Sequence, residues 1–242
     1  MRPLFALIHS PLVGPVTWSA VAGELSRRRV AVVVPDLGAP VASETGPHWK
    51  RHVALAARAI ASVPAAVSVM LVGHSGAGVL LPAIRESMER ACAGYIFVDA
   101  GLPNGNEPRK GMGGFAQHLD EIHAQGERFP HWSDEDLRDV LPVPAVRTAL
   151  LRELRPQPPD FWDETMPVFA GWPDAPCAYI RFGPNPSYDA AAEEAQRRGW
   201  RYRDLGGAHF HMLVDPVAVT DDLLAIEAAF AGARGVGDEG KR

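Results

Sequence analysis

The chain has few of the features that mark several large classes of protein. It contains two cysteines, Cys92 and Cys177, which are far apart and lack the spacing of zinc ligands. Neither a disulfide framework nor a metal site is therefore expected, and both cysteines are predicted to be buried apolar positions. No apolar run approaches the roughly 20 residues of a membrane span, and the apolar stretch at the start is too short for a signal peptide. We expect a protein of the cytoplasm.

Charge is also unremarkable in amount and distribution. The formal net charge is -5, and the lysines and arginines are scattered along the 242 residues. Such a chain offers no basic patch for nucleic acid or for an anionic membrane, so neither partner is expected. The length and the 47% share of hydrophobic residues suit one well-buried domain. The remaining candidate partner is a small-molecule substrate, with no cofactor implied.

Short apolar segments rich in β-branched residues alternate with helical patterns along the chain. Six strands are predicted, at 4–9, 30–34, 67–72, 94–98, 178–182 and 202–205. Helical spacing of apolar residues is found at 18–28, 49–62, 78–90, 190–198 and 217–231. This alternation predicts a mostly parallel six-stranded sheet with helices on both faces. Ligands of such sheets bind beyond the carboxyl ends of the strands, so chemistry is expected from the residues that follow each strand.

Residues 101–172 interrupt the alternation and are expected to form an inserted helical cap, with helices near 115–125 and 134–154. A cap at the carboxyl edge of the sheet would roof the site, select the substrate and exclude water. The tail, 232–242, is rich in glycine and charge and is expected to be disordered.

The strongest local signal is the run Leu-Val-Gly-His-Ser-Gly-Ala-Gly at 71–78. A buried strand that leads into a glycine-flanked serine and then a helix is typical of a nucleophile elbow. The tight turn needs small neighbours around Ser75, and the chain supplies them. The usual pattern would place glycine at position 77, where this chain has Ala77 and shifts the glycine to Gly78. Ser75 is the predicted nucleophile.

A serine hydroxyl needs a base that is itself oriented by a third group. Among nine histidines, His209 lies after the last predicted strand and before the last helix, where a base that follows the serine in chain order would stand. His211 is two residues further on, and spacing alone does not exclude it. For His211 and His74 a structural role is the better interpretation.

These segments together resemble the α/β-hydrolase superfamily, in particular its small members with one cap, such as plant methylesterases and hydroxynitrile lyases. Residues 9–18 resemble the His-x-x-x-x-Gly-x-x-x-Trp oxyanion loop, 73–78 the elbow, and 209–216 the histidine segment that ends in x-Pro. The resemblance spans nearly the whole chain outside the cap. It implies a three-layer fold with a Ser-His-Asp site.

The acid is less clear from the sequence. In most members of the family it follows the strand that corresponds to 178–182, but here Asn185 stands at the expected position and Asp189 comes late. Pancreatic-type lipases carry the acid one strand earlier, and in this chain the buried strand 94–98 ends in Asp99. A carboxylate at that strand end is costly unless it has partners. We predict that Asp99 orients His209, with Asp189 as the alternative acid.

The oxyanion hole has an unusual loop. The N–H of Gly76, the residue after the nucleophile, is one expected donor. By the resemblance the second comes from the position of Pro11, which has no N–H. The N–H of Leu12 or the hydroxyl of Ser10 would replace it; otherwise the hole is half-built and ester hydrolysis is weakened.

We therefore expect a cofactor-independent serine hydrolase that acts on a small ester, thioester or lactone through an acyl-enzyme. Pro11 and the unusual acid loop keep two alternatives open. One is lyase, elimination or cyclase chemistry, in which the Ser75 hydroxyl belongs to a proton relay. The other is a ligand-binding member of the fold with little turnover.

Overall fold

The sheet is parallel throughout and confirms the predicted fold class. A computed structural model describes the chain except for residues 1, 41–45, 65–67, 106–107, 110–113 and 240–242. Its six strands lie in the order β2-β1-β3-β4-β5-β6, and every neighbouring pair is parallel. Their bounds are β1 Leu4–Ile8, β2 Val32–Val33, β3 Val69–His74, β4 Cys92–Val98, β5 Cys177–Arg181 and β6 Arg201–Asp204.

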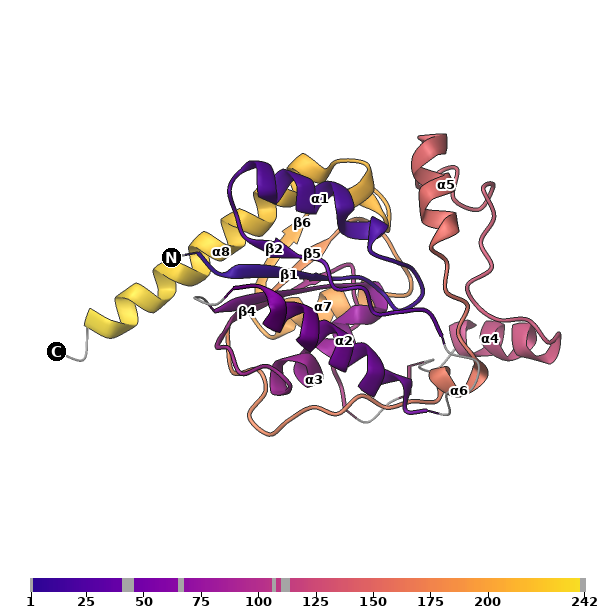
Figure 1. The fold of residues 1–242 in the computed structure, drawn as a ribbon, viewed down its shortest axis with the longest axis horizontal. Helices are drawn as coiled ribbons and strands as arrows, with labels where there is room; N and C mark the ends of the chain where they lie inside the picture. Colours follow the sequence, from indigo (N-terminus) through magenta and orange to yellow (C-terminus); the bar gives the residue numbers. More distant parts are fainter. Residues whose placement is uncertain (1, 41–45, 65–67, 106–107, 110–113, 240–242) are drawn as a thin grey trace.

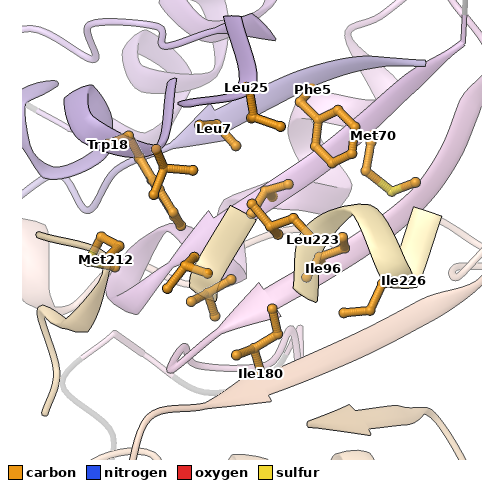
Figure 2. Close-up of a cluster of buried hydrophobic side chains, with 14 of the residues drawn as sticks. Phe5, Leu7, Trp18, Leu25, Met70, Ile96, Ile180, Met212, Leu223 and Ile226 are labelled. Carbon is orange, nitrogen blue, oxygen red and sulfur yellow. The ribbon is translucent and has the colours of Figure 1, made fainter. Parts of the chain in front are cut away.

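Helices cover both faces of this sheet (Figure 1). One face carries α1 (Val16–Arg27) and α8 (Pro216–Glu239), and the other carries α2 (His48–Ser62), α3 (Leu81–Glu86) and α7 (Asp189–Arg197). Because side chains alternate along a strand, Phe5 and Leu7 of β1 enter one core cluster and Ala6 enters the other. Figure 2 shows the first cluster packed between the sheet and the α1 and α8 layer. Burial of each such aliphatic or aromatic side chain contributes about 1.5–3 kcal/mol to the free energy of unfolding. This packing holds the strands, and with them the residues at their ends, in place.

The chain between β4 and β5 forms the cap, which lies beyond the carboxyl ends of the strands (Figure 1). It contains α4 (Gly114–Ala124), α5 (Pro144–Arg152) and α6 (Pro159–Trp162), with a small core of Leu119, Phe161 and Trp162. The helix expected at 134–154 is reduced to α5. Pro144 explains this, because a residue before proline is disfavoured in a helix whereas proline itself suits the first helical turn.

Other expected elements differ in extent. The helix expected at 78–90 is split into a 3₁₀ turn, η1 (Ser75–Leu80), and the short α3, in whose first turn Pro82 stands. The strand expected at 30–34 keeps two residues as edge strand β2, and Val67 of the strand expected at 67–72 lies outside the described residues.

The start of the tail expected to be disordered is helical. Residues 232–239 continue α8, which projects past the sheet (Figure 1), while 240–242 lie outside the described residues. Val219, Leu223 and Ile226 anchor this helix on the core, and helix propagation from an anchored segment costs less than a new nucleus.

Other general features of the described residues can be stated briefly. No described helix is both long and apolar enough to cross a membrane, and no group of three or more described His, Cys, Asp or Glu side chains could hold a metal ion. Both cysteines are free thiols; Cys177 is buried and Cys92 is partly buried. Burial raises the pKa of Cys92 to about 11 and that of Cys177 to about 12, so both stay protonated at neutral pH.

Three of the buried histidines have a pKa that burial lowers. They are His9, His52 and His74, each no more than 2% exposed. Burial lowers the pKa of His9 to about 4 and that of His52 to about 3, and it lowers the pKa of His74 well below its usual value. All three are neutral in the folded protein at physiological pH.

The neutral histidines predict a loss of stability in mild acid. A histidine in the unfolded chain is protonated below about pH 6.5, whereas folded His52 stays neutral down to about pH 3. The free energy of unfolding therefore falls as the pH falls through this window. The variant His52→Leu should flatten the dependence by up to about 1.4 kcal/mol per pH unit, measured by urea unfolding between pH 7.5 and 4.5. Exposed His118 provides the matched control, and His118→Leu should leave the slope unchanged. An unchanged slope in His52→Leu would show that His52 is not held neutral.

Candidate active site

Ser75 occupies a strained turn directly after β3. Its φ is 58°, in the left-handed region that non-glycine residues rarely adopt. A Cβ at Gly78 would come within 2.1 Å of the Gly101 carbonyl oxygen, so only glycine fits there. Ala77 is fully buried in the core instead. The close approach of the chain at Gly101 therefore explains why the elbow carries glycine at position 78.

A second left-handed turn follows β4, the neighbouring strand. Asp99 has a φ of 42°, and its N–H donates to the carbonyl of Ile180 on β5 at 2.8 Å. The Tyr179 hydroxyl bonds both the N–H and the carbonyl of Ala100, at 3.0 Å each. The N–H of Gly101 donates to the Ser75 carbonyl at 3.3 Å. These bonds hold the turn at Asp99 beside the elbow.

The carboxylate of Asp99 and the ring of His209 are in direct contact. Oδ2 of Asp99 lies 2.6 Å from Nδ1 of His209 and also accepts a bond from the Asn185 amide at 2.9 Å. Asp99 is 1% exposed, whereas the His209 side chain keeps 21% of its surface. A buried carboxylate on Nδ1 fixes the tautomer of the imidazole and stabilises its protonated form.

His74, the residue before the nucleophile, helps to place His209. Its Nε2 donates to the His209 carbonyl at 2.8 Å, and the two rings lie 4.5 Å apart. His74 is neutral because burial, followed by the nearby His209, lowers its pKa. His74 therefore positions the backbone of His209.

The alternative acid and the rival histidine lie elsewhere. Asp189 pairs with Arg181 at 2.6 Å and accepts the Asn185 N–H at 3.1 Å; the Arg181 guanidinium holds the pKa of Asp189 below its usual range. The ring of His211 packs against Phe182 at 5.5 Å. The structure brings Asp99, and not Asp189, to His209.

Tyr188 is a site residue that the sequence analysis missed. Its hydroxyl lies 2.9 Å from Ser75 Oγ. Within the described residues, the Ser75 side chain makes this one hydrogen bond. The phenol ring also stacks on the ring of His209, with centroids 5.2 Å apart and planes inclined by 16°. Burial raises the pKa of Tyr188 to about 12, so the phenol keeps its proton. The only available signal was its place in the loop after β5.

The loop after β1 brings a hydroxyl to the elbow. The Leu12 N–H donates to Ser10 Oγ at 3.3 Å, and the same oxygen lies 3.2 Å from where a Cβ would stand on Gly76. The cap holds this loop from above, because Gln157 donates to the Pro11 carbonyl at 2.7 Å. The Leu12 N–H is thus engaged, and the Ser10 hydroxyl is the polar group that faces Gly76.

A cavity of about 280 Å³ joins the elbow to the cap. On the sheet side its lining includes Ser10, Gly76 and Tyr188. On the cap side its lining includes Arg109, Phe161, Trp162, Glu164 and Met166. Ser75 is 5% exposed and is not among the described residues that line this cavity, whereas Tyr188, its hydrogen-bond partner, is.

Comparison with known proteins identifies the family. A family model described as "Alpha/beta hydrolase family" matches residues 6–222. The chain belongs to the alpha/beta hydrolase family. No curated protein sequence matches this hydrolase.

Solved structures of the same fold cover nearly the whole hydrolase. An extracellular alpha/beta-hydrolase from a Paenibacillus species has 15% identity and a TM-score of 0.75, with 93% of this chain and 98% of that chain covered. Tomato methylketone synthase I, in complex with 2-tridecanone, has 16% identity, a TM-score of 0.69 and coverage of 95% and 99%. A methylesterase from Arabidopsis has 18% identity, a TM-score of 0.66 and coverage of 92% and 98%. At these identities the likeness shows the shared fold.

The hydrogen bond between Tyr188 and Ser75 predicts a partly restrained nucleophile. Removal of the phenol oxygen in Tyr188→Phe frees the serine hydroxyl for His209. A net hydrogen bond of about 0.5–1.5 kcal/mol corresponds to about 2- to 10-fold faster labelling of Ser75 by a fluorophosphonate. The measurement is the rate of label incorporation at pH 7.5, with Ser75→Ala as the blank.

Tyr202, on the edge strand β6, provides a matched control. Tyr202→Phe removes the same atom and should leave the labelling rate unchanged. Slower labelling of Tyr188→Phe would contradict the prediction and would make the phenol an aid to the attack of Ser75.

Proposed function

We propose that this hydrolase is a serine esterase that cleaves a small ester through Ser75, His209 and Asp99. The observation that carries the proposal is the 2.6 Å contact between Asp99 Oδ2 and His209 Nδ1 beside a serine in the strained elbow turn. Esterases and a methylesterase among the structures of the same fold support an ester as the substrate class. No cofactor takes part in the proposed reaction.

The reaction has two balanced halves. Ser75 Oγ attacks the ester carbonyl carbon while Nε2 of His209 takes the hydroxyl proton. The bond to the alcohol oxygen then breaks, and His209 returns the proton to that oxygen, which leaves an acyl group on Ser75. Water repeats the attack with the same base, releases the carboxylic acid and restores the serine. Asp99 stabilises the imidazolium that forms in each half.

The oxyanion is stabilised by two donors in this proposal. One is the N–H of Gly76. The other is the Ser10 hydroxyl, which accepts the Leu12 N–H and so keeps its own proton free to donate. A bond received from Leu12 polarises this hydroxyl and strengthens its donation. Ser10 thus replaces the donor that Pro11 lacks.

The hydrogen bond between Ser75 and Tyr188 favours one alternative. Two hydroxyl groups beside His209 form a relay suited to proton transfer in lyase, elimination or cyclase chemistry. Intact-mass measurement after rapid mixing with a p-nitrophenyl ester separates the two mechanisms. An acyl adduct on Ser75 supports the esterase, and turnover of the substrate without an adduct supports the relay.

The choice of acid predicts a sharp difference between two aspartates. Asp99→Asn keeps the shape but leaves His209 without a carboxylate, so kcat for p-nitrophenyl acetate should fall by about 10²- to 10⁴-fold. Asp189→Asn breaks an ion pair with Arg181 and should change kcat less than about threefold, in line with the small worth of exposed ion pairs.

Thermal unfolding of both variants serves as the control for folding. If both substitutions lower kcat equally, or if Asp99→Asn retains full activity with folding intact, the assignment of the acid is wrong.

A further inference from the structure

Arg109 of the cap has a buried side chain that makes few hydrogen bonds to the described residues. Its side chain is 5% exposed. Nε lies 3.4 Å from Oε2 of Glu164, and Nη2 lies 3.3 Å from Sδ of Met166. A guanidinium has five N–H donors, and a thioether is a weak acceptor. Among the described residues, the Arg109 side chain therefore has one oxygen acceptor, Oε2 of Glu164, at a long distance.

Arg147 in the same cap shows what a structural arginine looks like here. Its side chain is 7% exposed. Nε and Nη2 bind both oxygens of Asp134 at 2.7 and 3.1 Å, and Nη1 binds the carbonyls of Leu141 and Pro142. All three nitrogens are used. Arg109 has similar burial, but within the described part of the chain its side chain has one long ion pair with Glu164 and one contact with Met166. A buried cation with so few partners is costly.

Glu164 does not complete the set because its carboxylate serves a helix. Its oxygens accept the N–H groups of His48 and Trp49 at the start of α2, where a negative charge is favoured. Glu164 therefore has a role that is independent of Arg109. Among the described residues, this leaves Nη2 of Arg109 with a thioether as its acceptor and Nη1 with no side-chain bond, so both can serve another acceptor.

Arg109 borders the cavity above the elbow. Arg109 lines the same cavity as Ser10, Gly76 and Tyr188. The guanidinium lies over the ring of Phe161, with Cζ 4.2 Å from the ring centroid, and this cation–π contact stabilises it there. Burial lowers the pKa of Arg109 to about 10, so it stays charged at neutral pH. A planar charged fork of this kind matches a carboxylate.

The location of His209 decides which half of the ester enters this cavity. His209 lines a separate groove with Phe129, Trp132 and Phe210, and the alcohol that receives its proton must leave on that side. The acyl chain then occupies the cavity that contains Arg109. The mixed lining of the cavity, apolar at Phe161 and Trp162, suits a short hydrocarbon chain with a charged end.

We infer that Arg109 binds a free carboxylate of the acyl chain, so that the substrate is a monoester of a short dicarboxylic acid. The inference rests on the proposed esterase function. The products are the alcohol and the dicarboxylate, and Arg109 takes no part in bond breaking. Because the cavity is small, one chain length should be preferred over its neighbours.

The experiment compares charged and neutral esters of matched length. The substrates are the monomethyl esters of succinic, glutaric and adipic acid, with methyl pentanoate and dimethyl glutarate as neutral partners of the glutarate monoester. We expect kcat/KM for the best monoester to exceed that of its neutral partner about tenfold or more, since a hydrogen bond to a charged group is worth about 1.5–3 kcal/mol. Methanol release at pH 7.5 is the readout.

The variant Arg109→Met removes the fork and keeps most of the volume. It should raise KM for the monoester about tenfold or more and leave methyl pentanoate within about threefold of the wild type. Arg152→Met removes an exposed charge from α5 of the same cap and should change neither substrate. If Arg109→Met unfolds, Arg109→Lys keeps the charge, loses the fork and should weaken the preference for the monoester in part.

A binding measurement tests the inference without turnover. Titration calorimetry of Ser75→Ala with monomethyl glutarate should show binding that dimethyl glutarate lacks and that the added change Arg109→Met abolishes. If the calorimetric result holds while Ser75 neither labels nor turns over any ester, the carboxylate site stands and the proposed esterase function fails.

Two results overturn the inference while the esterase function stands. One is equal use of monoester and neutral ester by the wild type. The other is an equal loss on charged and neutral esters in Arg109→Met, which would make Arg109 a structural partner of Glu164.

Discussion

The buried carboxylate of Asp99 is the constraint on which the arrangement of the site depends. At 1% exposure it must find hydrogen-bond donors, and it takes them from two loops, Asn185 after β5 and His209 after β6. These loops therefore converge on the end of β4. The N–H of Gly101 ties that end to the Ser75 carbonyl, so Ser75 is placed by the same set of bonds as His209.

Asn185 gives this arrangement its particular form. It stands where most members of the family carry the acid, and an amide there has no negative charge to balance a protonated imidazole. Its side-chain nitrogen donates instead to Asp99 and lies 3.3 Å from His209 Nδ1, so Asn185 holds the Asp99–His209 pair in place. The exchange moves the negative charge one strand inward and leaves Asp189 to pair with Arg181 at the start of α7.

The sequence predicts those parts of the fold that depend on local pattern. Buried strands show as apolar runs, and Ser75 shows through its glycines, because sterics at a tight turn limit the residue type. The pairing of Asp99 with His209 spans 110 positions, so the sequence left Asp99 and Asp189 as two candidate carboxylates, and the structure places Asp99 beside His209. Tyr188 had no such signal, since its role depends on how one loop folds back over the elbow. The predicted helix lengths were wrong at 78–90 and 134–154, because proline and the elbow turn override the apolar periodicity there.

The cap is fastened on both sides of the elbow, and this limits what must move during a reaction. Gln157 holds the loop after β1 through the Pro11 carbonyl, and Glu164 holds the start of α2. A cap fixed at both points does not open as a free lid without breaking buried bonds. Tyr188, by contrast, covers Ser75 through one hydrogen bond and a ring contact with His209. Rotation of that one side chain, over two torsions, uncovers the nucleophile to the cavity at a much smaller cost than movement of the cap. For the proposed reaction, we therefore expect the movement that admits a substrate at Tyr188, in the same loop that carries Asn185.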